Sequence, residues 1–559
     1  MIVRASQHSE QRKLQLIAMR SIADIIKHKP HDLNLVSSCL MAILPDYFSL
    51  CFHDAGGYRE SMHEGMLHIE LWVVATTILH TVAFISVCLH ALQRRRNASA
   101  TILWIFVAWS FPLIGPLLYL SFGIDRVPDK GLRTRTVNQF MLTRRNAKHA
   151  AAEPFIAWHF NFSTRISDIE DGFCRKLNRS IDPLNPDHPL LDGNSILPLA
   201  GGDETYPLML QSIRAAKNHI HLQSFIIHRD NIGQQFLEEL SKKAKEGVQV
   251  RVLFDRFGST HAYLGGMFRK YRGQPNFHIC GWTQANPLKR QFQINMRNHR
   301  KNLVIDGHVA FFGGVNIAAE NITAGGKNAI RDYHFKVEGP LVHELQFSFL
   351  RDWYFMTKEP IDQLLNTNHF PEMLSIGSGR ARLIDSGPSA PPDLATETFF
   401  NAIIMAQKQI LVVTPYFVPT NDIIRALGSA ARRGVDVRLI VPQENNHRYA
   451  GMASKALFEE LLISGVQIYQ RKPPFIHAKA MVVDSCIALV GTANMDVRSL
   501  ELNYETIALL EDARAIDKLK LMIHEDMENS SEINLNEWMS RPAIQKLAEN
   551  LCSLMTPVL

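Results

Sequence analysis

The sequence predicts an α/β fold with two similar repeats of mixed β-sheet and flanking helices, preceded by a hairpin of two transmembrane helices. Three observations support this fold class. Two uncharged apolar runs lie near the start of the 559-residue chain. Apolar strand segments alternate with helical segments through residues 196–510, as in α/β domains. A set of polar residue types recurs in register, which indicates an internal repeat.

The hairpin is predicted from residues 71–92 and 101–122, neither of which contains Lys, Arg, Asp or Glu. Each run has about the 20 residues that cross a bilayer. Three arginines at 94–96 lie in the short loop between the runs. Pro112 and Pro116 are expected to kink the second helix, which membrane helices tolerate. A pair of buried core helices is the alternative interpretation of these two runs.

The charges that follow the hairpin predict its orientation. Residues 124–150 contain seven Lys or Arg against two Asp. Positive charge prefers the cytoplasmic side. The hairpin loop carries positive charge more densely, but the flank carries more in total and favours a cytoplasmic location for the residues after it. The same flank would attract anionic lipid head groups, and the formal net charge of +6 fits such a surface.

The chain is expected to have five parts. Residues 1–66 form an N-terminal extension of unknown role with a helix at 6–27, and translation beginning at Met62 or Met66 is an alternative expectation. Residues 67–123 form the hairpin, 124–195 a juxtamembrane linker, 196–370 the first repeat, and 371–559 the second repeat with C-terminal helices.

Both repeats are predicted to contain the same succession of strands and helices. In the first repeat, strands are expected at 219–227, 248–254, 301–305 and 308–312, with a helix at 233–246. In the second repeat, strands are expected at 410–415, 436–441 and 480–483, with a helix at 421–433. The two sheets are expected to pack so that the faces carrying the repeated polar residues meet.

The repeated polar residues follow the pattern His-x-Lys-x4-Asp with a later Gly and Asn. Because residues i and i+2 of a strand share a face, each His projects together with its Lys. Each Gly permits a tight turn. Every member of the second set lies 178 positions after its counterpart: His299, Lys301, Asp306, Gly313 and Asn316 are followed by His477, Lys479, Asp484, Gly491 and Asn494.

Two Lys, two Asn and two His around a shared centre suit a tetrahedral anion such as a phosphodiester. One imidazole can attack phosphorus while the other protonates the leaving oxygen, which requires opposite protonation states. Asp332 and Glu505 each follow a repeat's Asn and are candidates to orient the imidazoles. A single His-x-Lys is more typical of a solvated strand edge, but the doubled set indicates function.

The sequence predicts neither a metal site nor a cofactor. No His or Cys pair near the repeated residues has the spacing of metal ligands. The seven Cys are scattered without a CxxC, which also argues against a disulfide framework. Cys280 and Cys486 lie in apolar surroundings and are expected in the core.

The doubled motif resembles the signature of the phospholipase D superfamily. The flanking segments 298–316 and 491–505 resemble those of bacterial cardiolipin synthases, and so does 109–116 in the second apolar run. The resemblance covers roughly residues 67–559. Two departures concern substrate preference: Gln223-Ser224-Phe225 stands where aromatic residues are usual, and Ala478 where a small hydroxyl residue is common.

The resemblance implies that a phosphatidyl group moves from one phosphatidylglycerol to another. His299 would form a phosphohistidine, and His477 would protonate the leaving glycerol and activate the second lipid hydroxyl. It also implies a multi-pass protein of the bacterial inner membrane that works on phosphatidylglycerol and other anionic phospholipids and not on nucleic acid. Predicted catalytic residues are His299, Lys301, Asp306, His477, Lys479 and Asp484; Asn316 and Asn494 are predicted to bind phosphate, with Asp332, Glu505, Gly313 and Gly491 supporting.

Three other functions compete with this one. A membrane-bound phospholipase D would use the same residues to release phosphatidic acid to water. A nuclease of the superfamily would need an extended basic groove with stacking aromatics, and the hairpin argues against it. A non-catalytic membrane scaffold is disfavoured because both His, both Lys and both Asn are present.

Overall fold

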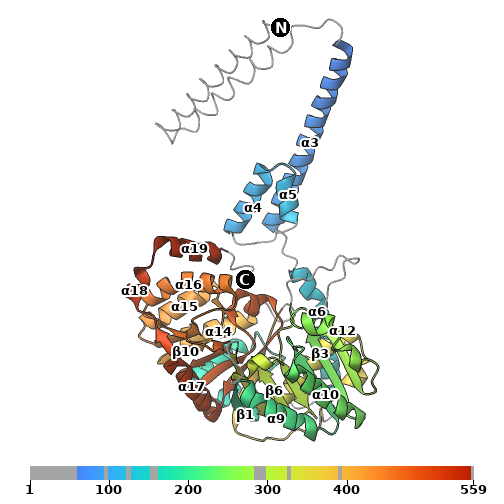
Figure 1. The fold of residues 1–559 in the computed structure, drawn as a ribbon, viewed down its shortest axis with the longest axis vertical. Helices are drawn as coiled ribbons and strands as arrows, with labels where there is room; N and C mark the ends of the chain where they lie inside the picture. Colours follow the sequence, from blue (N-terminus) through green and yellow to red (C-terminus); the bar gives the residue numbers. More distant parts are fainter. Residues whose placement is uncertain are drawn as a thin grey trace. The chain divides into compact units, whose positions relative to one another are not determined.

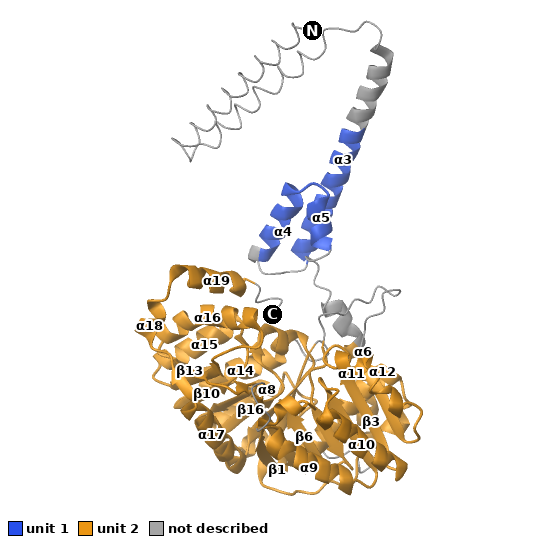
Figure 2. Cartoon of the chain, viewed as in Figure 1, with its two compact units in different colours: residues 1–125 blue, residues 126–559 orange. Residues whose placement is uncertain are grey.

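The computed structural model describes residues 59–93, 98–120, 127–151, 161–282, 297–323, 329–387 and 393–554. The chain divides into two compact units, Met1–Asp125 and Arg126–Leu559 (Figure 2). The helix predicted at 6–27 lies outside the described residues.

Unit 1 has one helix of membrane-spanning length. This helix, α3 (Arg59–Gln93), contains the apolar segment Trp72–Gln93, and most of the side chains of that segment are exposed. The second predicted span is divided into α4 (Ala98–Ser110) and the short α5 (Ile114–Leu118). Within the described part of the chain, α3 alone is long and apolar enough to cross a bilayer, so a hairpin of two spanning helices is not confirmed.

The second apolar run is divided because the chain turns after Ser110. Pro112 has no backbone N–H with which to continue the helix. Leu113 takes a positive φ of 59°. Gly115 then lies so close to α4 that an added Cβ would be 2.2 Å from the carbonyl oxygen of Val107. The kink that the sequence predicted is therefore a break.

Unit 2 begins with α6 (Val127–Ala150), in the segment predicted to be a linker. The second half of α6 packs on α12 (Leu341–Thr357). Arg351 of α12 donates to Asn138 at 3.2 Å, and the rings of Phe140 and Tyr354 stack at 5.8 Å. The segment then continues into α8 (Gly172–Ile181) and the first strand of the sheet.

A single sheet of 15 strands forms the centre of unit 2. The first repeat contributes β1 (Leu191–Ala200), β2 (His219–Ser224), β3 (Gln249–Asp255), β4 (Phe277–Trp282), β5 (Asn302–Ile305), β6 (Val309–Gly313) and β8 (Tyr333–Glu338). The second contributes β9 (Gly379–Ser386), β10 (Gln409–Val413), β12 (Asp436–Pro442), β13 (Gln467–Arg471), β15 (Ala480–Val483), β16 (Ile487–Gly491) and β18 (Glu505–Glu511), with β19 (Ser530–Glu532) at the edge.

The two repeats have the same strand order, read outward from the middle of the sheet. The first repeat runs β1-β8-β6-β5-β2-β3-β4, and the second runs β9-β18-β16-β15-β10-β12-β13. Antiparallel pairing of β1 with β9 joins them. The mixed sheet and the repeats are confirmed, but the expectation of two separate sheets is wrong, because this central pairing makes one continuous sheet.

Helices cover both faces of the sheet (Figure 1). On one face lie α9 (Gly201–Ala215) and α10 (Asn231–Lys245) of the first repeat and α14 (Leu394–Met405) and α15 (Asn421–Arg432) of the second. On the other face lie α12 and α17 (Ala513–Glu528). The alternation of strand side chains explains both cores: Leu303 and Ile305 pack with α10, whereas Val304 packs with α12.

Short elements complete unit 2. They are η3 (Ile166–Asp168), α11 (Thr260–Leu264), η4 (Arg269–Tyr271), η6 (Ala319–Asn321), β7 (Ile330–Arg331), α13 (Ile361–Leu364), β11 (Phe417–Val418), α16 (Arg448–Ile463), β14 (Phe475–Ile476), β17 (Met495–Asp496), η8 (Arg498–Leu502), α18 (Leu535–Met539) and α19 (Ala543–Ser553). Each strand and helix that the sequence predicted within the repeats is confirmed to within a few residues.

Candidate active site

Backbone pairing brings each histidine of the motif beside the other repeat. Strand β14, directly before His477, pairs in parallel with β7, directly before Asp332. In the same way Asn298, before His299, bridges Tyr504, before Glu505. The histidine amides complete this arrangement, since His477 N donates to Arg331 O at 2.7 Å and His299 N to Tyr504 O at 2.9 Å.

Each imidazole therefore meets a carboxylate from the opposite repeat. His299 Nδ1 lies 2.9 Å from Glu505 Oε2, and His477 Nδ1 lies 2.6 Å from Asp332 Oδ2. Both carboxylates are fully buried, and Thr492 donates its hydroxyl to Glu505 Oε2 at 2.6 Å. With Nδ1 directed at a carboxylate, Nε2 is the nitrogen that remains for a substrate. The sequence indicated both acids, but not that they are exchanged between repeats.

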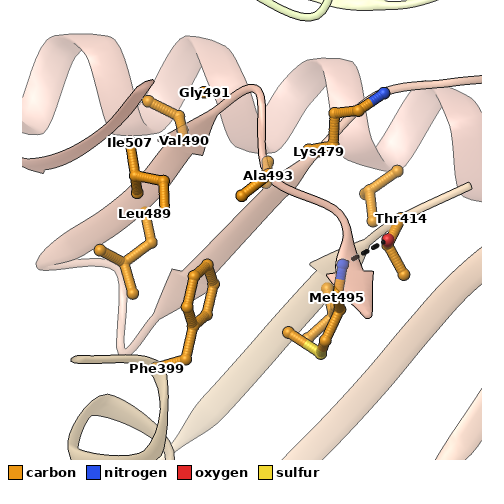
Figure 3. Close-up of a pocket in the computed structure, with 12 residues that line it drawn as sticks. Phe399, Thr414, Lys479, Leu489, Val490, Gly491, Ala493, Met495 and Ile507 are labelled. Carbon is orange, nitrogen blue, oxygen red and sulfur yellow. Dashed lines mark hydrogen bonds between the residues drawn. The ribbon is translucent and has the colours of Figure 1, made fainter. Parts of the chain in front are cut away.

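The two motif lysines lie beside these pairs. Lys301 Nζ donates to the carbonyl oxygen of His299 at 2.7 Å. Lys479 Nζ donates to the carbonyl oxygen of His477 and lies 2.8 Å from its Nδ1. Figure 3 shows the stem of Lys479 beside an apolar pocket lined by Phe399 and Met495, with its ammonium group directed away from these side chains. The lysine charges are thus held at the histidines.

Burial shifts the pKa values of the whole centre. It lowers the pKa of Lys301 to about 7 and that of Lys479 to about 8. It also lowers the pKa of His299, against the opposing charge of Glu505. Burial and then Lys479 lower the pKa of His477 to about 4. An unliganded centre therefore keeps its imidazoles neutral, and an incoming anion would favour protonation of these four bases.

The pKa values of the two carboxylates are also lowered, but here neighbouring charges and not burial are the cause. Burial alone would raise the pKa of Asp332, but the charges of Lys479 and His477 outweigh it and lower that pKa. The pKa of Glu505 is likewise lowered, because His299 and Lys301 outweigh burial. Both carboxylates are therefore charged, as stabilisation of an imidazolium requires.

Comparison with known proteins agrees with this geometry. Residues 209–353 and 399–527 match the family model "Cardiolipin synthase, PLD-like domain", and residues 78–123 match "Phospholipase_D-nuclease N-terminal". Cardiolipin synthase of Alkalihalophilus pseudofirmus is 33% identical over 501 residues, covering 88% of this chain and 95% of the relative. Cardiolipin synthase of Geobacillus kaustophilus is 34% identical over 500 residues, covering 86% and 93%. The chain belongs to the cardiolipin synthase family.

This membership makes the protein a phosphatidyltransferase of the phospholipase D superfamily and a membrane-associated enzyme. The solved phosphatidylserine synthase of Haemophilus influenzae has the same fold, with a TM-score of 0.53 and 17% identity over 69% of this chain and all of that one. The departures noted at Gln223 and Ala478 do not alter the family assignment.

The motif aspartates of this cardiolipin synthase homologue bind backbone N–H groups. Asp306 Oδ1 and Oδ2 accept the backbone N–H groups of residues 217, 218 and 219, and Asp484 accepts those of residues 407, 408 and 409. Asp306 follows β5 and Asp484 follows β15, whereas the histidines precede these two strands. Strands rise about 3.3 Å per residue, so the aspartates lie on the order of 15 Å from Lys301 and Lys479. These contacts fix the strand ends, and a catalytic role of the two aspartates stays a prediction.

The predicted phosphate-binding asparagines are both buried near the ends of the motif strands. Asn316 Oδ1 accepts the backbone N–H of Ile226 at 3.3 Å. Asn494 lies beside Asp496, whose pKa burial raises to about 6, and Asn494 Oδ1 has no hydrogen-bond partner. An unsatisfied amide oxygen at this place leaves Asn494 able to reorient toward a ligand. Phosphate binding by both residues stays a prediction.

The two motif glycines allow close packing of neighbouring strands. Gly313 has φ of 143° and Gly491 has φ of 146°. A Cβ on Gly491 would lie 2.0 Å from the carbonyl oxygen of Thr506, and one on Gly313 would lie 2.7 Å from the Cα of His334. The two glycines therefore let β6 approach β8 next to Asp332 and let β16 approach β18 next to Glu505.

Sequence reasoning missed Arg300, the residue between the motif His and Lys. Its guanidinium is completely buried on the opposite face of the chain. It donates to Asp352 at 2.5 Å and to Asp385 of the second repeat. Burial would raise the pKa of Asp385, but Arg300 and Arg351 outweigh it and lower that pKa to about 2.

A signal for Arg300 was present in the comparison of the two motif copies. The equivalent position in the second copy, Ala478, is also fully buried. An arginine where the repeat has an interior alanine needs buried acidic partners. Arg300 therefore ties the two repeats together directly behind the motif histidines.

One group of potential metal ligands occurs among the residues that the structure describes, and it lies away from the histidines. It consists of Asp171, Cys174 and Cys486, with Cys486 in the turn after β15. Cys486 is thus at the strand end remote from His477. Within the described residues, no such group occurs at the paired histidines.

Proposed function

We propose that this member of the cardiolipin synthase family joins two phosphatidylglycerol molecules into cardiolipin through a covalent phosphohistidine. The observation that supports it is the exchanged pair of imidazole–carboxylate contacts, His299 with Glu505 and His477 with Asp332. Two equivalent bases of this kind can serve as nucleophile and as general acid.

In the first step we assign His299 as the nucleophile. Its neutral Nε2 attacks the phosphorus of one phosphatidylglycerol, and Glu505 stabilises the positive charge that develops on the ring. The bond from phosphorus to the head-group glycerol oxygen breaks, and His477 gives its proton to that oxygen. Lys301 and Lys479 stabilise the phosphoryl oxygens as point charges. Free glycerol leaves.

The second step reverses the proton transfer. A glycerol hydroxyl of the second phosphatidylglycerol attacks the phosphohistidine and gives its proton to His477. The bond between phosphorus and His299 Nε2 breaks, and cardiolipin forms. Two phosphatidylglycerols thus yield one cardiolipin and one glycerol. With water as acceptor the same steps would release phosphatidic acid.

The membrane arrangement completes the proposal. The enzyme sits in the bacterial inner membrane as a multi-pass protein, with α3 as one span and the apolar run at 101–122 as a second. The catalytic unit lies on the cytoplasmic side, as the basic flank at 124–150 favours. Its partners are anionic phospholipids and not nucleic acid.

Purified full-length protein with phosphatidylglycerol alone tests the function. Mass spectrometry should find cardiolipin and glycerol in equal amounts without divalent metal or nucleotide. Strict dependence on CDP-diacylglycerol would refute the mechanism, and phosphatidic acid as the main product would identify a phospholipase D. Acid-quenched protein should carry phosphate on His299, and phosphate on His477 would exchange the two assignments.

A further inference from the structure

The C-terminal helix α19 carries a row of large apolar side chains that the rest of the described chain does not cover. The exposed fractions are 74% for Ile544, 64% for Leu547, 66% for Leu551 and 76% for Leu554. Spacings of three, four and three residues place all four on one side of the helix. Leu554 follows the last residue of α19, Ser553.

The orientation of α19 is the reverse of that of an ordinary surface helix. The side opposite the apolar row packs against the protein: Glu549 is buried and accepts from Arg541 at 2.9 Å, and Cys552 contacts Met452 of α16. A surface helix normally buries its apolar stripe and exposes charge. Contiguous exposed apolar side chains instead mark an interaction surface.

We propose that this apolar row inserts into the surface of the lipid bilayer, so that α19 is an interfacial contact in addition to the spanning helix α3. Helices that bind bilayers in this way have an apolar side and a basic flank. Here Lys546 precedes Leu547 of the row and pairs with Glu459 of α16 at 3.3 Å. Glu549, the one acidic residue of α19, is buried and paired, so α19 presents no negative charge to anionic head groups.

The position of α19 within unit 2 supports a bilayer over another partner. The chain passes directly from unit 1, which holds the membrane helix, into α6 at the start of unit 2. Helices α6 and α19 lie at the same end of unit 2 in the view of Figure 1. The end of unit 2 that holds its first helix is therefore also the end that exposes the apolar row.

Insertion of α19 would give unit 2 a second attachment and restrict its rotation on the lipid surface. Such restriction raises the effective concentration of lipid head groups at the paired histidines. The inference rests on the proposed membrane function, but not on which alcohol accepts the phosphatidyl group.

Quenching by brominated acyl chains tests insertion without turnover. We would place the full-length Leu551→Trp variant in phosphatidylglycerol–phosphatidylethanolamine vesicles with and without bromine. The matched control is Leu521→Trp, since Leu521 is 71% exposed and its helix, α17, lies at the opposite end of unit 2 from α19 in Figure 1. Because the chain already has seven Trp, the readout is the emission added over the parent protein.

The expected result is at least a twofold loss of the added emission for Leu551→Trp and none for Leu521→Trp. Unquenched, red-shifted emission from Leu551→Trp would place the row in water and overturn the proposal. Unquenched, blue-shifted emission would also overturn it, because protein, such as a second copy of the chain, would then cover the row.

Turnover by a double variant tests whether insertion of α19 raises activity on a lipid bilayer. Leu547→Gln with Leu551→Gln should lower turnover of phosphatidylglycerol in vesicles about tenfold, corresponding to about 1.4 kcal/mol of lost lipid contact. Turnover in detergent micelles should equal that of the parent, and Leu521→Gln should change neither. Equal loss in vesicles and micelles would overturn the proposal. Absence of parent turnover in both vesicles and micelles would instead refute the proposed function, and the quenching result would still stand.

Discussion

Replacing Glu505 by Gln removes one charge from the catalytic centre and leaves its shape intact. Glu505 Oε2 accepts from Thr492 and lies 2.9 Å from His299 Nδ1, and an amide oxygen can keep both contacts. Asn503 Nδ2 donates to Oε1 at 3.3 Å, whereas Asn503 Oδ1 has no partner. After rotation of the Asn503 amide, its Oδ1 would accept a hydrogen bond from the new N–H of the glutamine side chain. The fold of Glu505→Gln should be that of the parent.

The size of the effect follows from the lost charge. A hydrogen bond to a charged partner contributes about 1.5–3 kcal/mol, and 1.4 kcal/mol is a factor of ten. If Glu505 stabilises the ring of His299 in the transition state, kcat should fall about 10- to 150-fold. Glu505 opposes the burial that lowers the pKa of His299, so its loss lowers that pKa further. A nucleophile must be neutral, and the acidic limb of kcat/KM should therefore move to lower pH.

The matched variant Asp332→Asn separates the two histidine roles. A phosphatidyl ester of 4-nitrophenol has a leaving group that needs no proton, so the first step on this substrate does not require an acid. Release of nitrophenolate should be close to that of the parent in Asp332→Asn and remain slow in Glu505→Gln. Parent-like activity of Glu505→Gln on phosphatidylglycerol would refute the role of the exchanged carboxylate, and the reverse rescue pattern would refute the order of the histidines.

Three further variants or conditions test the surroundings of the site. Arg300→Met should lower the free energy of unfolding by about 3 kcal/mol, because the buried carboxylates of Asp352 and Asp385 then share Arg351 alone. Arg300→Lys should recover part of this loss in a thermal melt, and an unchanged melting temperature would contradict the tie between repeats. Asp306→Ala should cost about 2 kcal/mol of stability, because three backbone N–H groups lose their acceptor. The folded fraction should bind inorganic phosphate like the parent. Lost phosphate affinity at parent stability would instead support a catalytic role of Asp306. Affinity for inorganic phosphate should fall between about pH 6 and about pH 9. The reason is that protonated Lys301 and Lys479 bind anions and lose their protons above pKa values of about 7 and about 8. A flat profile in a titration would show that the lysines do not bind the phosphate.

The repeat and most of its strands were predictable because they depend on local pattern. The segment 480–483 is apolar and β-branched, and the structure has a strand over the same residues. The constant spacing of 178 predicted that two strands with equivalent side chains exist. It carried no information on how the repeats join, because the pairing of β1 with β9 involves polar and glycine-containing segments without a strong periodic signal.

The sequence predicted which residues form the candidate site better than it predicted how their side chains are arranged. Asp332 and Glu505 were selected by their position after the asparagines, yet their exchange between repeats results from long-range pairing of β7 with β14. Asp306 and Asp484 recur as regularly as the histidines, but recurrence also marks structural positions. Both have positive φ, and both cap backbone N–H groups. A residue can recur in both repeats for its chemistry or for its part in the fold, and the contacts of its side chain are needed to distinguish the two.

The exchange of acids gives the duplicated chain a reason to keep both halves. Each imidazole is oriented by a carboxylate that the other repeat supplies: Glu505 for His299 and Asp332 for His477. Since Arg300 also pairs with an acid of each repeat, loss of the contact between repeats would uncouple both histidines at once. The two copies share one motif but differ at the residue between His and Lys and in the contact of Lys479 with His477 Nδ1. Such differences around matching histidines are what the proposed division into nucleophile and acid requires.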